Sequence, residues 1–113
     1  LHRLRYIDQA RGTEQIDNFE ELQPEAELDR IYFNARRPVL VVDGARHLLV
    51  HSEGFQDVVV WNPGAEKCAA ISDMPADAWR HMLCVEAAVV GTPVLLPAGE
   101  EWVGRQSLTL EVP

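Results

Sequence analysis

Short apolar runs, separated by clusters of turn residues, recur along the whole chain and predict β-strands. Alternation of polar and apolar positions is typical of a strand with one buried face, whereas β-branched runs indicate more deeply buried strands. The predicted strands cover residues 1–9, 28–33, 39–42, 47–51, 57–61, 82–90, 94–96 and 102–112. Because these strands are short and follow one another at a spacing of roughly ten residues, they predict an all-β antiparallel fold of the β-sandwich type.

Turn residues divide the middle of the chain into three strands. Asp43-Gly44 is a strong signal for a two-residue hairpin turn. Glu53-Gly54 predicts the next turn, and residues 62–64 end the third strand because proline lacks a backbone donor and glycine accepts a positive φ. The three strands are therefore expected to pair in sequence as a meander.

Two segments depart from the strand pattern. Residues 13–28 are polar and acidic and predict a long connection, with room for one short strand near 13–17. Residues 76–81 predict a short helix of about two turns, with Ser72 or Asp73 as the capping residue. The fold is thus expected to contain one short helix among its antiparallel strands.

Length, composition and charge limit the class of protein. A chain of 113 residues with 47% apolar and 25% charged residues is typical of a single globular domain. Its net charge of -8 would repel a nucleic-acid backbone, and its apolar runs are far too short to cross a membrane. Nucleic acid and membrane are therefore not expected as partners.

The cysteines indicate the cellular compartment of the protein, and the first residues indicate whether the chain is complete. Cys68 and Cys84 have no CxxC spacing and lie among small apolar residues, as expected for buried, reduced thiols of a cytoplasmic protein. The chain starts at Leu1, without an initiator methionine and in the middle of a predicted strand. We therefore expect a piece of a longer protein, with no targeting segment before it.

Glu86 is the sharpest candidate for chemistry because it ends an apolar run that starts at Met82. An unpaired carboxylate is expensive to bury, so Glu86 either points to water or faces a cleft. Asp29 and Arg30 interrupt another apolar strand, where they form either an edge-strand ion pair or part of a site. Trp61 can stack on a sugar face or simply pack against the core. Because the four histidines are scattered, no metal ion is expected.

Several motifs and their spacing resemble the glucose-6-phosphate 1-epimerases, or hexose-6-phosphate mutarotases, which are related to aldose 1-epimerases. The motifs are V-W-N-P-G at 60–64, D-M-P-x-D at 73–77, M-L-C-V-E at 82–86, L-D-R-I-Y at 28–32 and P-A-G-E-E-W at 97–102. They cover nearly all of the chain but correspond only to the C-terminal part of the family's proteins. The resemblance implies that residues 1–113 are that portion of a galactose-mutarotase-like β-supersandwich, without its upstream half.

The resemblance also implies a role for Glu86 and for Asp29. Glu86 matches the family's general base, which removes the proton from the anomeric hydroxyl, and Asp29 matches the residue that hydrogen-bonds sugar hydroxyls. Arg30 and Trp61 are weaker candidates for the substrate-binding cleft. The implied activity is that of an isomerase, which interconverts the α and β anomers of a hexose 6-phosphate, with glucose 6-phosphate as the expected sugar and no cofactor.

The acid partner of Glu86 is not expected in this chain. Ring opening needs a base and an acid together, because one oxygen loses a proton while the ring oxygen gains one. The family's catalytic histidine and its phosphate-binding arginines lie in the upstream portion. We therefore expect the fragment alone to be inactive, and its uncovered sheet surface to allow self-association. The alternative is a non-catalytic β-sandwich that binds carbohydrate or a partner protein.

Overall fold

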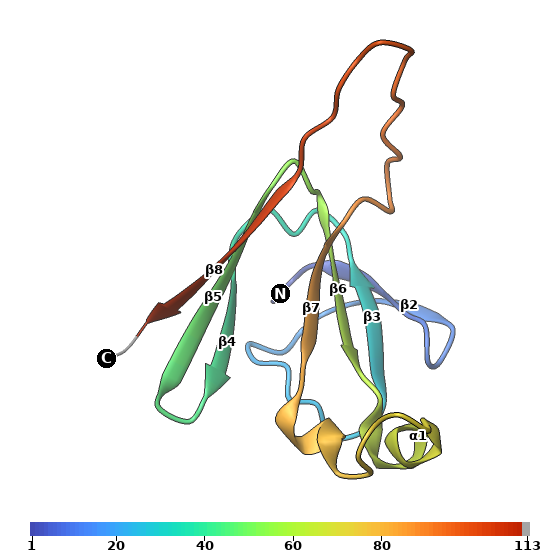
Figure 1. Ribbon diagram of the computed structural model, residues 1–113, viewed down its shortest axis with the longest axis vertical. Helices are drawn as coiled ribbons and strands as arrows, with labels where there is room; N and C mark the ends of the chain where they lie inside the picture. Colours follow the sequence, from blue (N-terminus) through green and yellow to red (C-terminus); the bar gives the residue numbers. More distant parts are fainter. Residues whose placement is uncertain (112–113) are drawn as a thin grey trace.

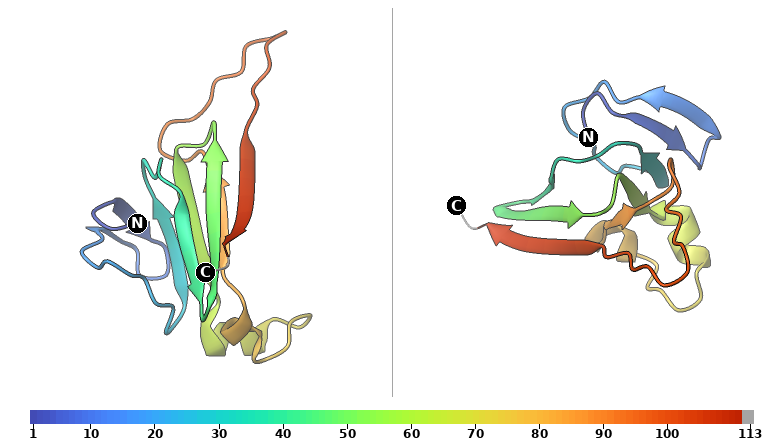
Figure 2. Two further views of the ribbon diagram at one scale, coloured as in Figure 1. Left: turned by 90° about the vertical axis from the view of Figure 1, so that its left-hand side faces the viewer. Right: turned by 90° about the horizontal axis from the view of Figure 1, so that it is seen from above.

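Two antiparallel β-sheets make up the framework of the protein (Figure 1). The computed structural model describes residues 1–111. The larger sheet has the strand order β2-β1-β3-β6-β7, with β2 and β7 at its opposite edges (Figure 2), and the smaller sheet has the order β4-β5-β8. The strands are β1 Arg5–Asp8, β2 Thr13–Ile16, β3 Leu28–Tyr32, β4 Val39–Asp43, β5 Arg46–Glu53, β6 Asp57–Asn62, β7 Cys84–Ala88 and β8 Arg105–Glu111. This arrangement confirms the predicted antiparallel all-β class, and β2 is the short strand for which residues 13–28 left room.

The core lies on one face of the larger sheet, around its central strand β3. Tyr32 is fully buried there and pairs with Tyr6 of β1 on one side and Val58 of β6 on the other. The two tyrosine rings lie 5.0 Å apart, and Val60 and Leu28 complete the buried set. Each buried valine or leucine stabilises the fold by about 1.5–3 kcal/mol. We call this side of the sheet the core face and the opposite side the outer face.

The predicted hairpin is confirmed, although Asp43 pairs with Arg46 and its two turn residues are Gly44 and Ala45, one position later than predicted. The predicted meander of three strands is wrong. Strands β4 and β5 pair across this turn, whereas β6 crosses to the larger sheet, where it lies between β3 and β7. At Gly54, where the chain turns, an added Cβ would lie 2.7 Å from the Val103 carbonyl oxygen, so only glycine fits. The three consecutive valines at 58–60 suit a central strand, because they place apolar side chains on both of its faces.

The helical segments differ from the prediction. Ala78–His81 form a single 3₁₀ turn, η1, instead of about two turns of helix, and its N-cap residue is Asp77 rather than Ser72 or Asp73. The helix α1, Gly64–Ala70, was not predicted, although it starts where the turn residues correctly end β6. Neither helical segment in residues 1–111 is long and apolar enough to cross a membrane.

The predicted strand at 94–96 is wrong. Residues 89–104 form one long loop that projects beyond the ends of both sheets (Figure 1), and Leu95 within it is 89% exposed. Pro93 and Pro97 flank the apolar segment and lack the backbone donors that strand pairing needs. The apolar run is therefore a loop and not a strand.

The closing strand β8 begins later than predicted. Trp102 lies before it and packs edge-to-face on Phe55, with the ring centroids 5.2 Å apart. Within β8 the predicted alternation places Leu108 and Leu110 on one face, but both side chains are more than half exposed, so the strand is not half-buried as expected. Val112, also predicted in this strand, lies outside the described residues. The exposed leucines leave apolar side chains on an uncovered sheet face, and self-association through uncovered sheet surface stays a prediction.

Candidate functional site

Three of the four candidate residues share the outer face of the larger sheet. Asp29 and Trp61 are direct partners across β3 and β6, and Glu86 of β7 pairs with Val59 of β6. Side chains of directly paired residues point to the same side of a sheet, and so do residues two apart along a strand. Asp29, Trp61 and Glu86 therefore point away from the core, whereas Arg30 points toward it.

The outer face presents these side chains as an open surface. Glu86 is exposed, and Asp29 and Trp61 are half-buried. Strand spacings of about 4.8 Å and a rise of about 3.3 Å per residue put the Cα atoms of Asp29 and Glu86 about 12 Å apart. Within residues 1–111, no three His, Cys, Asp or Glu side chains gather closely enough to hold a metal ion.

Cys84 lies on the same face, opposite Trp61 and two residues before Glu86. Burial raises the pKa of the Cys84 thiol, and the negative charge of Glu86 raises it further. Cys84 therefore stays a neutral thiol near neutral pH. The other cysteine, Cys68, is fully buried, and its thiol donates to the Pro75 carbonyl oxygen at 3.2 Å.

Replacing Glu86 with glutamine is expected to make Cys84 more reactive. Loss of the carboxylate charge lowers the pKa of the thiol, so more thiolate forms at a given pH, although burial still holds this pKa above that of a free cysteine. The measurement is the rate of alkylation by iodoacetamide between about pH 7 and pH 10. Cys84→Ala identifies the reacting thiol, and Glu53→Gln on the smaller sheet is the matched control. An unchanged pH profile in Glu86→Gln contradicts the prediction.

Asp29 has a polar neighbour, Gln9, on the outer face. The side-chain amide of Gln9 donates to Asp29 Oδ1 at 3.1 Å, and the backbone N–H of Gln9 donates to the Asp29 carbonyl oxygen at 2.7 Å. Gln9 follows β1 and continues the register in which Asp8 lies opposite Arg30. Gln9 was not predicted as a site residue, because only the pairing of β1 with β3 brings it to Asp29, twenty positions along the chain.

Arg30 is separated from the other candidates by the thickness of the sheet. Its guanidinium lies over the Tyr6 ring, 4.4 Å from the ring centroid, and its Nη1 donates to the Tyr32 hydroxyl at 3.1 Å. The alternative of an edge-strand ion pair with Asp29 is wrong, since β3 is a central strand and the two side chains point to opposite faces. Arg30 supports the core behind Asp29.

A buried carboxylate completes the polar network behind β3. The Tyr32 hydroxyl donates to Asp17 Oδ2 at 2.7 Å, and the Asp17 side chain is 2% exposed. Burial raises the pKa of the Tyr32 hydroxyl, which therefore stays protonated and keeps its role as donor. Arg30 Nη1 lies 3.9 Å from the same Asp17 oxygen and balances its charge. The network ties the strand that carries Asp29 to the connection that follows β2.

Asn62 joins the end of β6 to the segment before β7. Its side-chain amide donates to the carbonyl oxygens of Trp79 and Met82, both at 2.9 Å, and its Oδ1 accepts the Gly64 N–H at 2.9 Å. Asn62 is 2% exposed, so these bonds are shielded from water. Asn62 thereby fixes the entry of the chain into the strand that carries Glu86.

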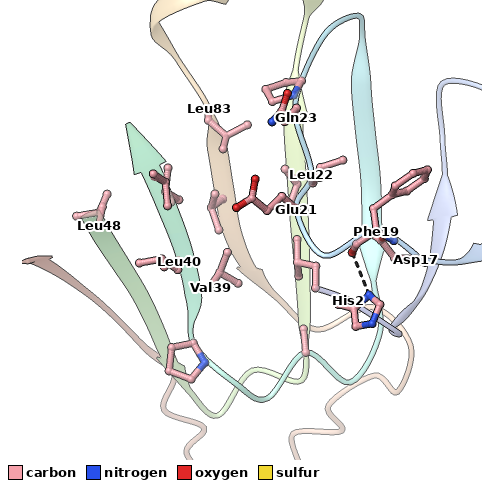
Figure 3. Close-up of a pocket in the computed structure, with 18 of the residues that line it drawn as sticks. His2, Asp17, Phe19, Glu21, Leu22, Gln23, Val39, Leu40, Leu48 and Leu83 are labelled. Atoms are coloured by element: carbon pink, nitrogen blue, oxygen red, sulfur yellow. Dashed lines mark hydrogen bonds between the residues drawn. The ribbon is translucent and has the colours of Figure 1, made fainter. Parts of the chain in front are cut away.

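A groove of about 1290 Å³ lies between the two sheets (Figure 3). Val39 and Leu48 line it from the smaller sheet, Val85 lines it from the edge strand β7 of the larger sheet, and Leu83 lines it from the segment just before β7. Val85 pairs with Val60 of the core, which places this groove on the core face. None of the three outer-face candidates lines the groove, so the groove and the candidate site are separate.

Comparison with known proteins gives these residues a context. Residues 5–109 match the aldose 1-epimerase family. The chain is 34% identical over 112 residues to the "Putative glucose-6-phosphate 1-epimerase" of Cenchrus ciliaris. This alignment covers 96% of this chain and 34% of that protein. A protein of the same name from Escherichia coli is 36% identical over 62 residues, covering 53% of this chain and 21% of that protein. The chain thus spans about a third or less of the length of these relatives.

A solved structure shares the fold. The crystal structure of a "putative mutarotase (YeaD)" from Salmonella typhimurium matches with a TM-score of 0.89 at 23% identity, over 97% of this chain and 38% of that chain. The two sheets therefore adopt a mutarotase-like β-sandwich fold, as the sequence motifs implied. Together with the family match over nearly the whole sequence, this shows that the chain belongs to the aldose 1-epimerase family.

Proposed function

We propose that the protein containing this chain is a mutarotase that interconverts the α and β anomers of a hexose 6-phosphate. One observation carries the proposal: Glu86, Asp29 and Trp61, which come from three strands, lie on the same open face of the larger sheet. The family match supports the reaction class. The names of the relatives from Cenchrus ciliaris and Escherichia coli support glucose 6-phosphate as the sugar.

Glu86 acts as the general base in this proposal. Its exposed carboxylate takes the proton of the anomeric hydroxyl as the bond between C1 and the ring oxygen breaks and C1 becomes an aldehyde carbon. The ring oxygen takes a proton from an acid, the C1–C2 bond rotates, and the same steps in reverse close the ring on its other face. We assign the acid, a histidine by family resemblance, to the part of the relatives that this chain does not span.

Asp29 and Trp61 hold the sugar in this proposal. The Asp29 carboxylate accepts hydrogen bonds from ring hydroxyls, and the half-buried Trp61 offers an apolar surface to the C–H groups of the ring. Arg30 is not included, because its side chain lies on the core face against Tyr6. The contacts to the phosphate are assigned, like the acid, to the part of the relatives outside this chain.

The proposal is tested by NMR exchange spectroscopy on the complete gene product that contains these residues. Glucose 6-phosphate is expected to show anomer exchange well above the uncatalysed rate, and glucose without the phosphate is expected to exchange more slowly. Equal rates for both sugars contradict the phosphate specificity. Sugar binding without faster exchange overturns the enzymatic function and favours the non-catalytic carbohydrate-binding alternative.

A further inference from the structure

The Asp29 carboxylate is held on the outer face by a side chain from another strand. The Gln9 amide nitrogen donates to Oδ1 of Asp29 at 3.1 Å. This contact occupies one oxygen of the carboxylate, and an ionised carboxylate can accept hydrogen bonds on both. Because the carboxylate is rigid and planar, the hydrogen bond to Oδ1 also fixes the direction of the second oxygen, Oδ2.

We propose that Gln9 is a positioning residue, which fixes the Asp29 carboxylate so that Oδ2 meets a sugar hydroxyl. The inference rests on the proposed function, since it assumes that Asp29 contacts the sugar. A half-buried aspartate otherwise rotates about its terminal torsion, which is broad and without sharp minima. Fixing this rotation before the sugar arrives removes part of the ordering that binding would otherwise require.

The amide of Gln9 suits this role because it is neutral and donates. A carboxylate at the same position would only accept hydrogen bonds and would repel Asp29. The backbone is secured separately, because the Gln9 N–H donates to the Asp29 carbonyl oxygen at 2.7 Å and any residue except proline keeps this bond. Gln9 is also exposed, so replacing its side chain leaves the core intact.

The test is a double-mutant cycle on the affinity for glucose 6-phosphate, measured by isothermal titration calorimetry with the complete gene product. Gln9→Ala is expected to weaken binding about 5- to 10-fold when Asp29 is present and less than about twofold in the Asp29→Ala background. Gln9→Glu is expected to weaken binding at least as much as Gln9→Ala. The kcat of anomer exchange is expected to stay within about twofold in Gln9→Ala while KM rises, because Glu86 is untouched.

The matched control is Gln15→Ala on the neighbouring strand β2. Gln15 pairs with Tyr6 and accepts a hydrogen bond from its hydroxyl, so it lies on the core side of the sheet, and its replacement is expected to leave the affinity unchanged. Equal effects of Gln9→Ala with and without Asp29 overturn the positioning role and leave the proposed function standing. Coupled binding effects without catalysed exchange support the positioning role and overturn the enzymatic function. Absence of glucose 6-phosphate binding to the wild type overturns both.

Discussion

Glu86→Gln is expected to lower the rate of glucose 6-phosphate anomer exchange by about 100- to 10,000-fold, the usual contribution of a general base. Glutamine has the same shape as glutamate, but its amide cannot accept the proton of the anomeric hydroxyl. Glu86 is exposed and lies on the edge strand β7, where it pairs with Val59, so the fold does not depend on its charge. The affinity for the sugar is expected to change little, because Asp29 and Trp61 remain in place.

The rate is measured by NMR exchange spectroscopy on the complete gene product, and urea denaturation shows whether the variant is still folded. Glu53→Gln provides the matched control, since it makes the same chemical change at an exposed position of the smaller sheet. Glu86→Asp adds a second comparison: it keeps a carboxylate but withdraws it from the ring, so an intermediate rate is expected. Exchange within about twofold of the wild type in Glu86→Gln shows that another group is the base.

The outer-face site could be predicted only in part from the sequence. Alternation along a strand already shows that Asp29 and Arg30 point to opposite sides. It does not show which side is buried, because that depends on the neighbouring strands. Tyr6 of β1 and Val58 of β6 pack with Tyr32 and thereby make the Arg30 side the core. The motif resemblance grouped both residues with the substrate, and only the sheet pairing separates them.

The segments predicted wrongly depend on contacts between distant parts of the chain. Gly64 ends β6 as predicted, but its φ of +71° also lets α1 start against the residues before β3, where an added Cβ would lie 2.7 Å from the Glu27 nitrogen. The apolar run 94–96 has strand-like composition, yet no strand within residues 1–111 pairs with it. Strand formation depends on such partners more than on local composition. Local signals therefore located the hairpin to within one residue but not the sheet to which each strand belongs.

Asn62→Asp is expected to lower the free energy of unfolding by at least about 3 kcal/mol. Aspartate has the shape of asparagine, but its carboxylate cannot donate to the Trp79 and Met82 carbonyl oxygens, which accept from the amide at 2.9 Å. A negative charge would instead face two carbonyl oxygens at a position that is 2% exposed. These two hydrogen bonds hold the segment that enters β7, so their loss is also expected to displace Glu86 and to slow anomer exchange.

Urea denaturation measures the loss from the shift of the midpoint at constant slope. Asn18→Asp makes the same chemical change in an exposed loop and is expected to stay within about 0.5 kcal/mol of the wild type. Asn62→Ala separates the lost hydrogen bonds from the added charge: it leaves the same carbonyl oxygens without donors and is expected to cost about 2–3 kcal/mol. If Asn62→Asp unfolds at the wild-type urea concentration, the amide does not hold the β6–β7 connection, and pairing with Val59 must position Glu86 by itself.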